Sequence, residues 1–497
     1  MNTTTTTAPP AAVPAATPKL ASAAWMAFAA LALGQLLVDI DDVVLNIALP
    51  TIAEEIGIPV GELPWVVNAY VLCFGGLLLL GGRLADRHGS RAVLLAGIAT
   101  FTVASGFGAL AQSTAQVVAA RAGQGLAAAL LAPAAMSLLV SVFPEPEERS
   151  RALGLWGAVT GAGAVLGLVV GGVVTEHLGW RWIFGGNAVV AIVIGASVVA
   201  LLPHGSRRRD VRIEPWGTLL ATAGLITAVY SLHGTLEHGW TDPRTLGLLA
   251  LSALALGAAV LVWRRGSAPL VPVRLLTDRA VLVSDACAAL TGASLLGTFY
   301  FVSLHLQEVL GYSPTATAWA YLPLVAGLVV AAGIGSALVP RLGARHVLVA
   351  GMAGCAKGLA LLALIGMSEA RGSFWTTLFP GLLICGLGLG LAFVSLTVTA
   401  IPGGEQSEDG GVASGLYNTS IQIGGALGIA VLATVATGRA HDLVAAGSDP
   451  IAAIVAGRTL ALYAGSALLV AGALIALLLP RTAGVTGDTG AHVTGAA

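Results

Sequence analysis

The stretch GGRLADRHGSRAVLLAG at 81–97 recurs at 335–351 as GSALVPRLGARHVLVAG, with nine identities in 17 positions and no gap. Trp65 and Trp319 share the same offset of 254 residues. A looser match follows. FPEPE at 143–147 resembles IPGGE at 401–405, and the spacing of glycines and leucines after FPEPE recurs after IPGGE. The two halves of the chain are therefore related, and we expect them to fold alike.

The sequence around these copies has the composition of a membrane protein. Of its 497 residues, 56% are hydrophobic and a further 65 are glycine, while only 10% are charged. Soluble proteins carry about 25% charged residues, so this chain could not cover several soluble domains. The formal net charge of -1 provides no basic field for a nucleic-acid backbone, which excludes nucleic-acid partners.

Fourteen apolar runs have the roughly 20 residues that cross a bilayer. Buried Ala-rich helices are the alternative for any single run. With both termini in the cytoplasm, 17 of the 24 Lys and Arg residues fall on the inside, as the positive-inside rule requires of a protein in the cell membrane. The predicted spans lie near 22–47, 65–84, 91–111, 116–140, 152–174, 182–202, 216–234, 245–263, 281–306, 316–337, 347–367, 375–400, 412–435 and 457–479, and the predicted outside loops hold Arg181, Arg244, Arg371, Arg439 and Arg458.

The repeat divides these spans into two bundles. Spans 1 to 6 pair with spans 9 to 14 and start on the same side, so the repeat is parallel, an architecture of secondary transporters. We therefore expect an all-α multi-pass membrane protein. Its parts are a disordered cytoplasmic tail at 1–21, a six-helix bundle at 22–203, two inserted helices at 204–275, a second six-helix bundle at 276–480 and a disordered tail at 481–497.

Four motifs carry a family resemblance that spans nearly the whole chain between the tails. GGRLADRHGSR resembles the signature between spans 2 and 3 of the major facilitator superfamily. DIDDVVLNIALP at 39–50 and GAGAVLGLVVGG at 161–172 resemble the span 1 and span 5 motifs of its fourteen-helix drug:proton antiporters, and RAGQGLAAALLAP at 121–133 is similar to their span 4 motif. Two departures are that Leu168 replaces a proline in span 5 and that Ile40 and Val43 replace Leu and Thr in span 1.

Three carboxylates in span 1 are candidates for proton coupling, because charges within a bilayer are costly and usually functional. The resemblance assigns the family's acidic residue to Asp41. Helical periodicity instead places Asp39 and Asp42 on one polar stripe with Asn46. Since three carboxylates cannot all ionise cheaply at close range, we expect at least one to carry a proton. Simple hydration near the outer surface is the alternative.

Arg121 in span 4 keeps its charge at physiological pH. By resemblance it is the proton-coupling arginine; the alternative is a structural role, bound to carbonyls or a lipid phosphate. The second repeat has no counterpart for it, so we expect the polar chemistry to concentrate in the first half.

The span 2 to span 3 motif is interpreted as a cytoplasmic gate, with plain topogenic charge as the alternative. Its carboxylate could bond arginines or a helix N-terminus, and its glycines permit a tight turn. In the second copy Pro340 replaces that carboxylate, so only the first copy could form the ionic latch. The predicted gate residues are Gly82, Asp86, Arg87, Gly89 and Arg91.

The span 5 glycines form a small-residue face for close helix contact, either sealing a leak path or simply packing. They are Gly163, Gly167, Gly171 and Gly172. Weaker candidates for a substrate cavity are Asn46, Gln124, Asp285 and Lys357, the last two of which are equally compatible with local hydration or snorkelling.

The energy source is not ATP, because neither Lys19 nor Lys357 lies in a phosphate-binding loop. One proton at a typical potential could support a substrate ratio of roughly a hundredfold. The sequence predicts proton-coupled efflux of small amphipathic or aromatic molecules, cations among them, by a monomer without cofactor, metal site or enzymatic activity. Proton symport for nutrient uptake and a non-transporting sensor are the alternatives.

Overall fold

The computed structural model describes residues 18–59, 61–202, 215–239, 241–265, 273–366, 374–376, 378–401 and 410–480. Within these ranges the chain is helical and contains no strand, which confirms the all-α prediction. The predicted tails lie almost wholly outside the described residues.

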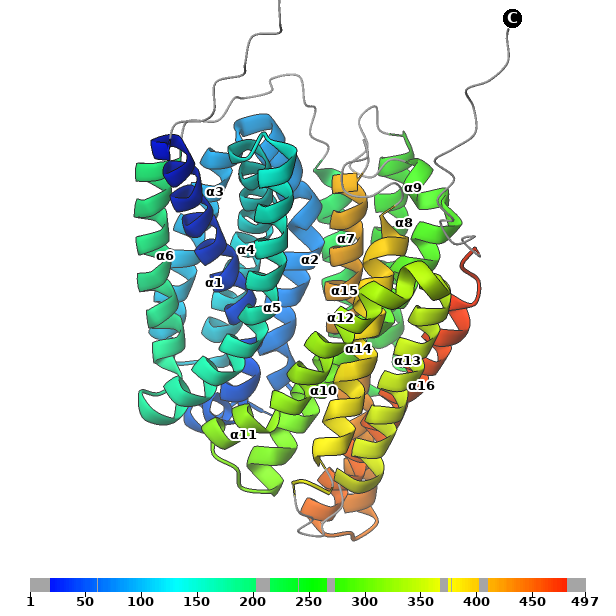
Figure 1. Cartoon of the computed structure of the whole chain (residues 1–497). Coiled ribbons are helices and arrows are strands. Elements are labelled where there is room, and N and C mark those ends of the chain that lie inside the picture. The colour runs from blue at the N-terminus through cyan, green and yellow to red at the C-terminus, as the bar shows by residue number, and fades with distance from the viewer. Residues whose placement is uncertain are drawn as a thin grey trace, which may run out of the picture.

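The first half is a bundle of six helices, and the second half repeats it. In Figure 1 the first bundle stands on the left and the second on the right. The first comprises α1 (Pro18–Ile56), α2 (Leu63–His88), α3 (Ser90–Ala109), α4 (Thr114–Val142), α5 (Pro146–His177) and α6 (Arg181–Leu201). The second comprises the short α9 (Val273–Thr277), α10 (Arg279–Leu304) with the π-helical η1 (His305–Val309), α11 (Pro314–Ala320), α12 (Leu322–Leu342), α13 (Ala344–Leu361) with the π-helical η2 (Leu362–Gly366), α14 (Leu378–Ala400), α15 (Gly410–Ala445) and α16 (Pro450–Ala476).

Eleven helices of the described ranges are long and apolar enough to cross a membrane, and each coincides with a predicted span. The chain is thus a multi-pass membrane protein. The remaining three predicted spans coincide with α1, α5 and α7 (Trp216–His238), helices of 39, 32 and 23 residues. At 1.5 Å per residue even α7 is about 34 Å long. The count of fourteen spans stays a prediction for these three.

The repeated stretch forms the same turn in both halves. Gly89 joins α2 to α3 with φ of 91°, and Gly343 joins α12 to α13 with φ of 81°. A backbone with positive φ strongly favours glycine, which explains why both copies keep it. The copies differ in the helix before this turn. α2 is continuous, whereas its counterpart breaks at Tyr321 between α11 and α12, and Pro323 lies in the first turn of α12.

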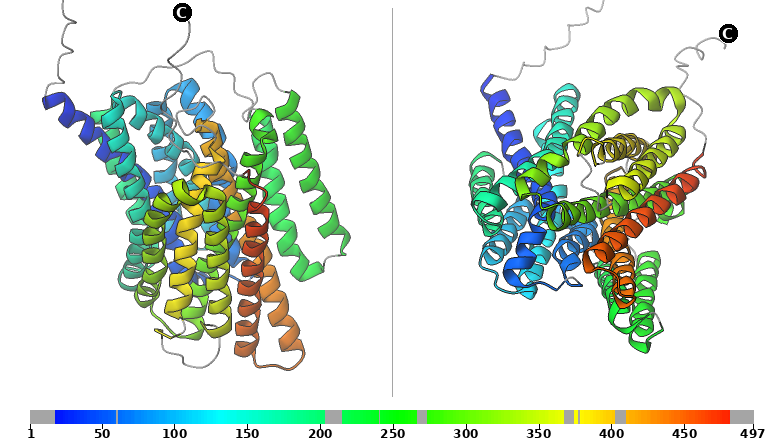
Figure 2. Two further views of the ribbon diagram at one scale, coloured as in Figure 1. Left: turned by 45° about the vertical axis from the view of Figure 1, so that its right-hand side comes forward. Right: turned by 90° about the horizontal axis from the view of Figure 1, so that it is seen from below.

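The inserted pair lies outside both bundles. α7 and α8 (Pro243–Arg265) pack against each other, and Figure 2 shows this green hairpin at the edge of the molecule. α7 contacts α2 of the first bundle and α15 of the second. Thr222 of α7 donates to the Gly76 carbonyl at 3.1 Å, and Thr434 of α15 donates to the Leu232 carbonyl at 3.2 Å. The hairpin therefore covers the seam between α2 and α15.

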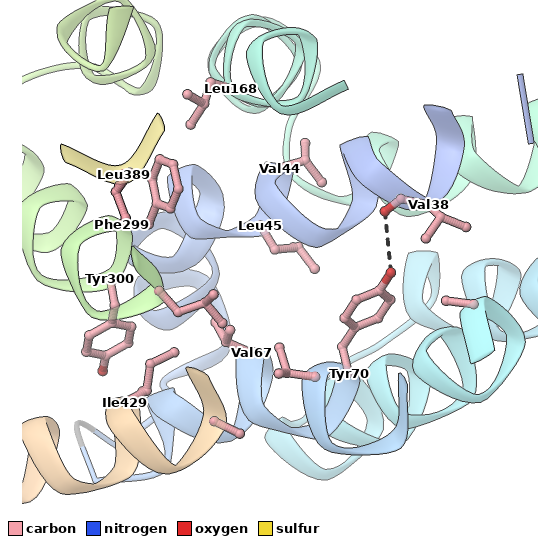
Figure 3. Packing of buried hydrophobic residues seen from close by; sticks show 14 of the residues in the cluster. Val38, Val44, Leu45, Val67, Tyr70, Leu168, Phe299, Tyr300, Leu389 and Ile429 are labelled. Carbon is pink, nitrogen blue, oxygen red and sulfur yellow. Dashed lines mark hydrogen bonds between the residues drawn. The ribbon is translucent and has the colours of Figure 1, made fainter. Parts of the chain in front are cut away.

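The two ends of the molecule differ in how the halves meet. We call the end with the α2–α3 turn the inner end (upper in Figure 1) because it is predicted to face the cytoplasm, and the opposite end the outer end. At the outer end α1 and α5 pack against α10 and α11. Residues of both halves share one apolar cluster, including Leu45 and Val67 of the first and Phe299 and Ile429 of the second (Figure 3).

Candidate functional site

A cavity of about 1420 Å³ lies between the two bundles. It runs from exposed Asp86 at the inner end to Asp39 and Asp42 of α1. This volume exceeds the usual 300–1,000 Å³ of small-molecule sites, so a drug-sized ligand would fit together with water. Its wall combines polar groups with apolar and aromatic side chains from α1, α2, α4, α5, α14 and α15, among them Gln35, Phe74, Met136, Trp156, Thr160, Phe393, Asn418 and Gln422.

Asp41 lies beside this cavity but outside its wall, buried within the first bundle. Its Oδ2 accepts a hydrogen bond from Arg121 Nη1 of α4 at 2.7 Å, and both side chains are buried, at 0% and 1% exposure. Its Oδ1 accepts from Gln124 Nε2 at 3.0 Å and from Asn187 Nδ2 of α6 at 2.6 Å. Three donors from two helices thus compensate one buried carboxylate, as a charge in an apolar interior requires.

Arg121 is fixed by further contacts. Its Nε donates to the Val66 carbonyl of α2 at 3.2 Å, and its Nη1 also donates to Gln124 Oε1 at 2.8 Å. The guanidinium lies 4.2 Å from the centre of the Tyr70 ring, a favourable cation–π geometry. The Tyr70 hydroxyl in turn donates to the Val38 carbonyl at 3.4 Å (Figure 3). The ion pair therefore joins α1, α2, α4 and α6.

Asp39 and Asp42 point the other way, into the cavity. Asp39 Oδ1 accepts from Gln35 Nε2 at 2.8 Å, and Thr160 of α5 lies next to it. Asp42 lies next to Gln422 of α15, which belongs to the second bundle. One oxygen of each carboxylate, Oδ2 of Asp39 and Oδ1 of Asp42, is buried without a hydrogen-bond partner among the described residues.

This arrangement reconciles the two arguments from the sequence. The motif alignment pointed to Asp41, and Asp41 pairs with the membrane arginine. The helical periodicity pointed to Asp39 and Asp42, and these share the cavity wall with Gln35. Successive residues of a helix differ in direction by about 100°, so neighbouring aspartates of α1 reach separate environments.

The span 5 glycines let α5 approach two partners. A Cβ on Gly163, Gly167 or Gly171 would lie within 2.6 to 3.0 Å of Asp39, Ile40 or Val44 of α1. A Cβ on Gly172 would instead lie 2.7 Å from the Pro314 carbonyl of α11, in the other bundle. Three of the glycines thus pack α5 within the first half, and the fourth brings the halves together at the outer end.

Two of the five predicted gate residues line the inner mouth of the cavity. Gly82 and Asp86 line it, and Arg87 is exposed. Asp86 forms no ion pair with another described residue, so the expected latch is not formed while the cavity is open at this end. Arg91 instead donates to the Val199 carbonyl of α6 at 2.8 Å, within the first bundle.

The four weaker cavity candidates do not line its wall. Asn46 is buried and donates to backbone carbonyls of α1, and Gln124 belongs to the Asp41 network. Asp285 is partly buried on α10, and Lys357 is exposed on α13. A single polar residue on an apolar helix does not indicate which way it faces, so the sequence alone could not place these four residues relative to the cavity.

Several residues of the site were missing from the sequence prediction. Asn187, which lies six residues into α6, was not among the predicted site residues. Trp156, Thr160, Asn418 and Gln422 have no motif behind them. The available signal was periodicity, since Asn418 and Gln422 lie four residues apart on one face of α15.

A family model described as Major Facilitator Superfamily matches residues 31–429. The chain belongs to the major facilitator superfamily. Solved structures agree on the fold of this major facilitator: an auto-inhibited POT family peptide transporter matches with a TM-score of 0.69 at 14% identity, covering 95% of this chain and 99% of that one. A bacterial homologue of the human lysosomal transporter Spinster matches with a TM-score of 0.63 at 16% identity, covering 94% and 98%.

Relatives by sequence include named resistance and export proteins. This major facilitator is 39% identical to the puromycin resistance protein pur8 of Streptomyces alboniger, over 94% of this chain and 93% of that protein. It is 40% identical to the cephamycin export protein CmcT of Amycolatopsis lactamdurans, over 80% and 82%. The lincomycin resistance protein of Streptomyces lincolnensis is 34% identical, over 83% and 84%.

Proposed function

We propose that this major facilitator is a proton-coupled exporter of small amphipathic molecules, such as antibiotics or toxic metabolites. It works as a monomer in the cell membrane, with both termini in the cytoplasm and without catalysing a reaction. The observation that carries the proposal is the buried Asp41–Arg121 pair, which lies one helix face away from two carboxylates in the central cavity.

The coupling follows from this proximity. The pair is electrostatically complete, so a proton can bind Asp41 only as Arg121 withdraws toward Gln124 and the Val66 carbonyl. A substrate held at Asp39 and Asp42 acts on the same segment of α1. Proton and substrate therefore act on the same segment of α1, and antiport requires that they bias this segment in opposite senses.

The cavity wall indicates an amphipathic substrate. Asp39 and Asp42 attract a positive group, while Phe74, Trp156 and Phe393 offer apolar and aromatic surface. The outward direction is supported by the relatives that are named for export or resistance.

Everted membrane vesicles test the proposal. Acidifying the lumen should drive accumulation of a substrate from a panel that includes puromycin, lincomycin and cationic dyes, and a protonophore should abolish it. Absence of accumulation across the panel would refute proton-driven export. Accumulation in right-side-out vesicles driven by outside acid would instead favour uptake by symport.

A further inference from the structure

The outer closure of the cavity contains a charged pair that the proposed coupling does not use. It lies where α10 continues into η1, a π-helical turn of five residues at His305–Val309. π-helical turns are rare and often occur at functional positions. This one faces the first bundle at the outer end, where the two halves must separate for release.

Hydrogen bonds from η1 and from the start of α11 join the halves at this end. Gln307 Nε2 of η1 donates to the Ile47 carbonyl of α1 at 2.9 Å. The backbone N–H of Thr315 in α11 donates to Glu176 Oε2 of α5 at 3.0 Å. The Gln307 contact is partly buried and the Thr315 contact is exposed, so Gln307 provides the better-shielded polar link between the halves.

The neighbouring residue, Glu308, holds η1 in place from the other side. Its carboxylate forms an ion pair with Arg458 of α16, within the second bundle. The Arg458 side chain is 9% exposed; its Nη2 binds Glu308, and its Nη1 has no hydrogen-bond partner among the described residues. A buried guanidinium needs its counter-ion, so the pair fixes η1 against α16.

Burial of Arg458 also corrects an expectation. The sequence placed it in an outside loop, but α16 begins seven residues earlier than predicted, at Pro450. Asp449 caps this helix by accepting hydrogen bonds from the N–H groups of Ile451 and Ala452, and proline is favoured at the first helical position. Arg458 therefore lies two turns inside the helix and faces η1.

The first bundle has an equivalent ion pair, which does not contact the second bundle. Glu55 at the end of α1 binds Arg181 at the start of α6 and accepts from Trp180 Nε1 at 2.7 Å. Both pairs tie the first helix of a bundle to its sixth. Only the Glu308 pair adjoins a side chain that reaches the opposite half.

We propose that the Glu308–Arg458 pair positions Gln307 on the Ile47 carbonyl and thereby holds the outer end closed while the cavity faces the cytoplasm. Glu308 and Arg458 are positioning residues for the outer gate. The inference rests on the proposed alternating access, and it adds residues of the second bundle to a mechanism so far built from the first.

Labelling from outside tests this gate. Ile421 lines the cavity, so Ile421→Cys, in a chain whose four native cysteines are replaced, reacts with an impermeant maleimide from outside only when the outer end opens. Glu308→Gln and Gln307→Ala should each raise the labelling rate about two- to tenfold, the range for loss of one hydrogen bond. The double variant should label no faster than either alone, and Glu55→Gln should match the parent.

Rescue separates positioning from general damage. Arg458→Lys keeps the charge, so its labelling rate should stay closer to that of the parent. Arg458→Gln removes the charge and should label as fast as Glu308→Gln. If Glu308→Gln does not fold, the Glu308→Gln/Arg458→Gln double variant removes the buried charge and should still label fast. Parental labelling rates in Glu308→Gln, in Arg458→Gln and in their double variant, or additive effects of Gln307→Ala and Glu308→Gln, would overturn the proposal.

The readout is independent of transport. Labelling requires neither substrate nor a proton gradient, so a chain that exports nothing still tests the gate. If Ile421→Cys is never labelled from outside in any variant, the gate proposal and alternating access both fail. If the variants label as expected but no panel compound is exported, only the proposed function fails.

Discussion

At the scale of single residues, Asp41 illustrates how a buried charge becomes usable. Its carboxylate is fully buried and accepts hydrogen bonds from three side chains. Removal of one partner of a buried ion pair typically costs about 3–5 kcal/mol because the other charge remains. The same interaction that stabilises the bundle is therefore available as a switch.

A double-variant cycle should reveal this dual role. We expect Asp41→Asn to lower the melting temperature in detergent, because Arg121 stays charged and buried. Asp41→Asn/Arg121→Gln should recover most of that stability, since no charge is left unpaired. Neither variant should show proton-driven transport. Full transport in the double variant would remove the pair from the mechanism.

The cavity carboxylates should affect affinity rather than coupling. We expect Asp39→Asn to raise the KM for the cationic dye ethidium about tenfold, the lower range for loss of a charged hydrogen bond. The KM for a neutral substrate should change little. Initial rates at graded substrate concentrations measure both, and an equal loss for the two substrates would contradict the assignment.

The sequence predicted these residues unevenly. Asp41 and Arg121 were identified by motif, and Asp39 and Asp42 by periodicity. Periodicity could have marked Gln422 as part of a polar face of α15, but not its position beside Asp42, which depends on the second bundle meeting the first. Contacts between halves arise from tertiary packing, which a pattern along one helix does not encode.

At the scale of elements, α5 combines two kinds of close contact on one helix. Gly167 faces α1 of its own bundle, and Gly172 faces α11 of the other. Replacing each by alanine places a Cβ 3.0 Å from the Ile40 carbonyl or 2.7 Å from the Pro314 carbonyl, respectively.

The two substitutions should therefore have different consequences. Gly167→Ala should lower thermal stability, because α1 and α5 stay in contact in every state of a rigid bundle. Gly172→Ala should leave stability nearly unchanged but slow transport and favour labelling from outside. Gly186→Ala serves as the control, because its Cβ would meet nothing within 4 Å. Equal loss of stability in the first two variants would contradict this distinction.

Helices were predictable to within a turn or so where Pro or Gly ends them, as at the Gly89 and Gly343 turns. The sequence did not predict how far the helices extend beyond the bilayer. α5 begins six residues before its predicted span, because its charged first turns carry no hydropathy signal. α16 begins seven residues before its predicted span, at Pro450, although this added stretch is apolar.

At the scale of the whole molecule, the outer surface of the first bundle provides a pH-dependent element outside the membrane. Hydrogen bonds from Arg181 and Trp180 hold the pKa of Glu55 below its ordinary value. A carboxylate with a lowered pKa stabilises the fold above its ordinary pKa, and this contribution is lost as the pH falls through the lowered value.

The stability difference between the parent and Glu55→Gln should therefore be constant from pH 8 to about pH 5 and shrink below it. Melting temperatures across that range measure it. The glutamine variant should be slightly less stable at neutral pH, since the exposed pair contributes little. A difference that grows toward acid pH would have the wrong sign for this account.

The repeat predicted two related bundles in this order, and the family model and solved structures agree with a major facilitator fold. The sequence did not predict which end of the cavity is open and which is closed. Opening at the inner end and closure at the outer end depend on many weak contacts between halves, and either arrangement satisfies the same hydropathy pattern.

The most direct test of proton coupling at Asp41 is proton movement driven by substrate. Proteoliposomes loaded with a substrate, in the absence of any initial pH gradient, should show a substrate-dependent pH change of the lumen that a protonophore collapses. We expect this signal in the parent and in Glu55→Gln, and its loss in Asp41→Asn. An undiminished proton signal in Asp41→Asn would contradict the account.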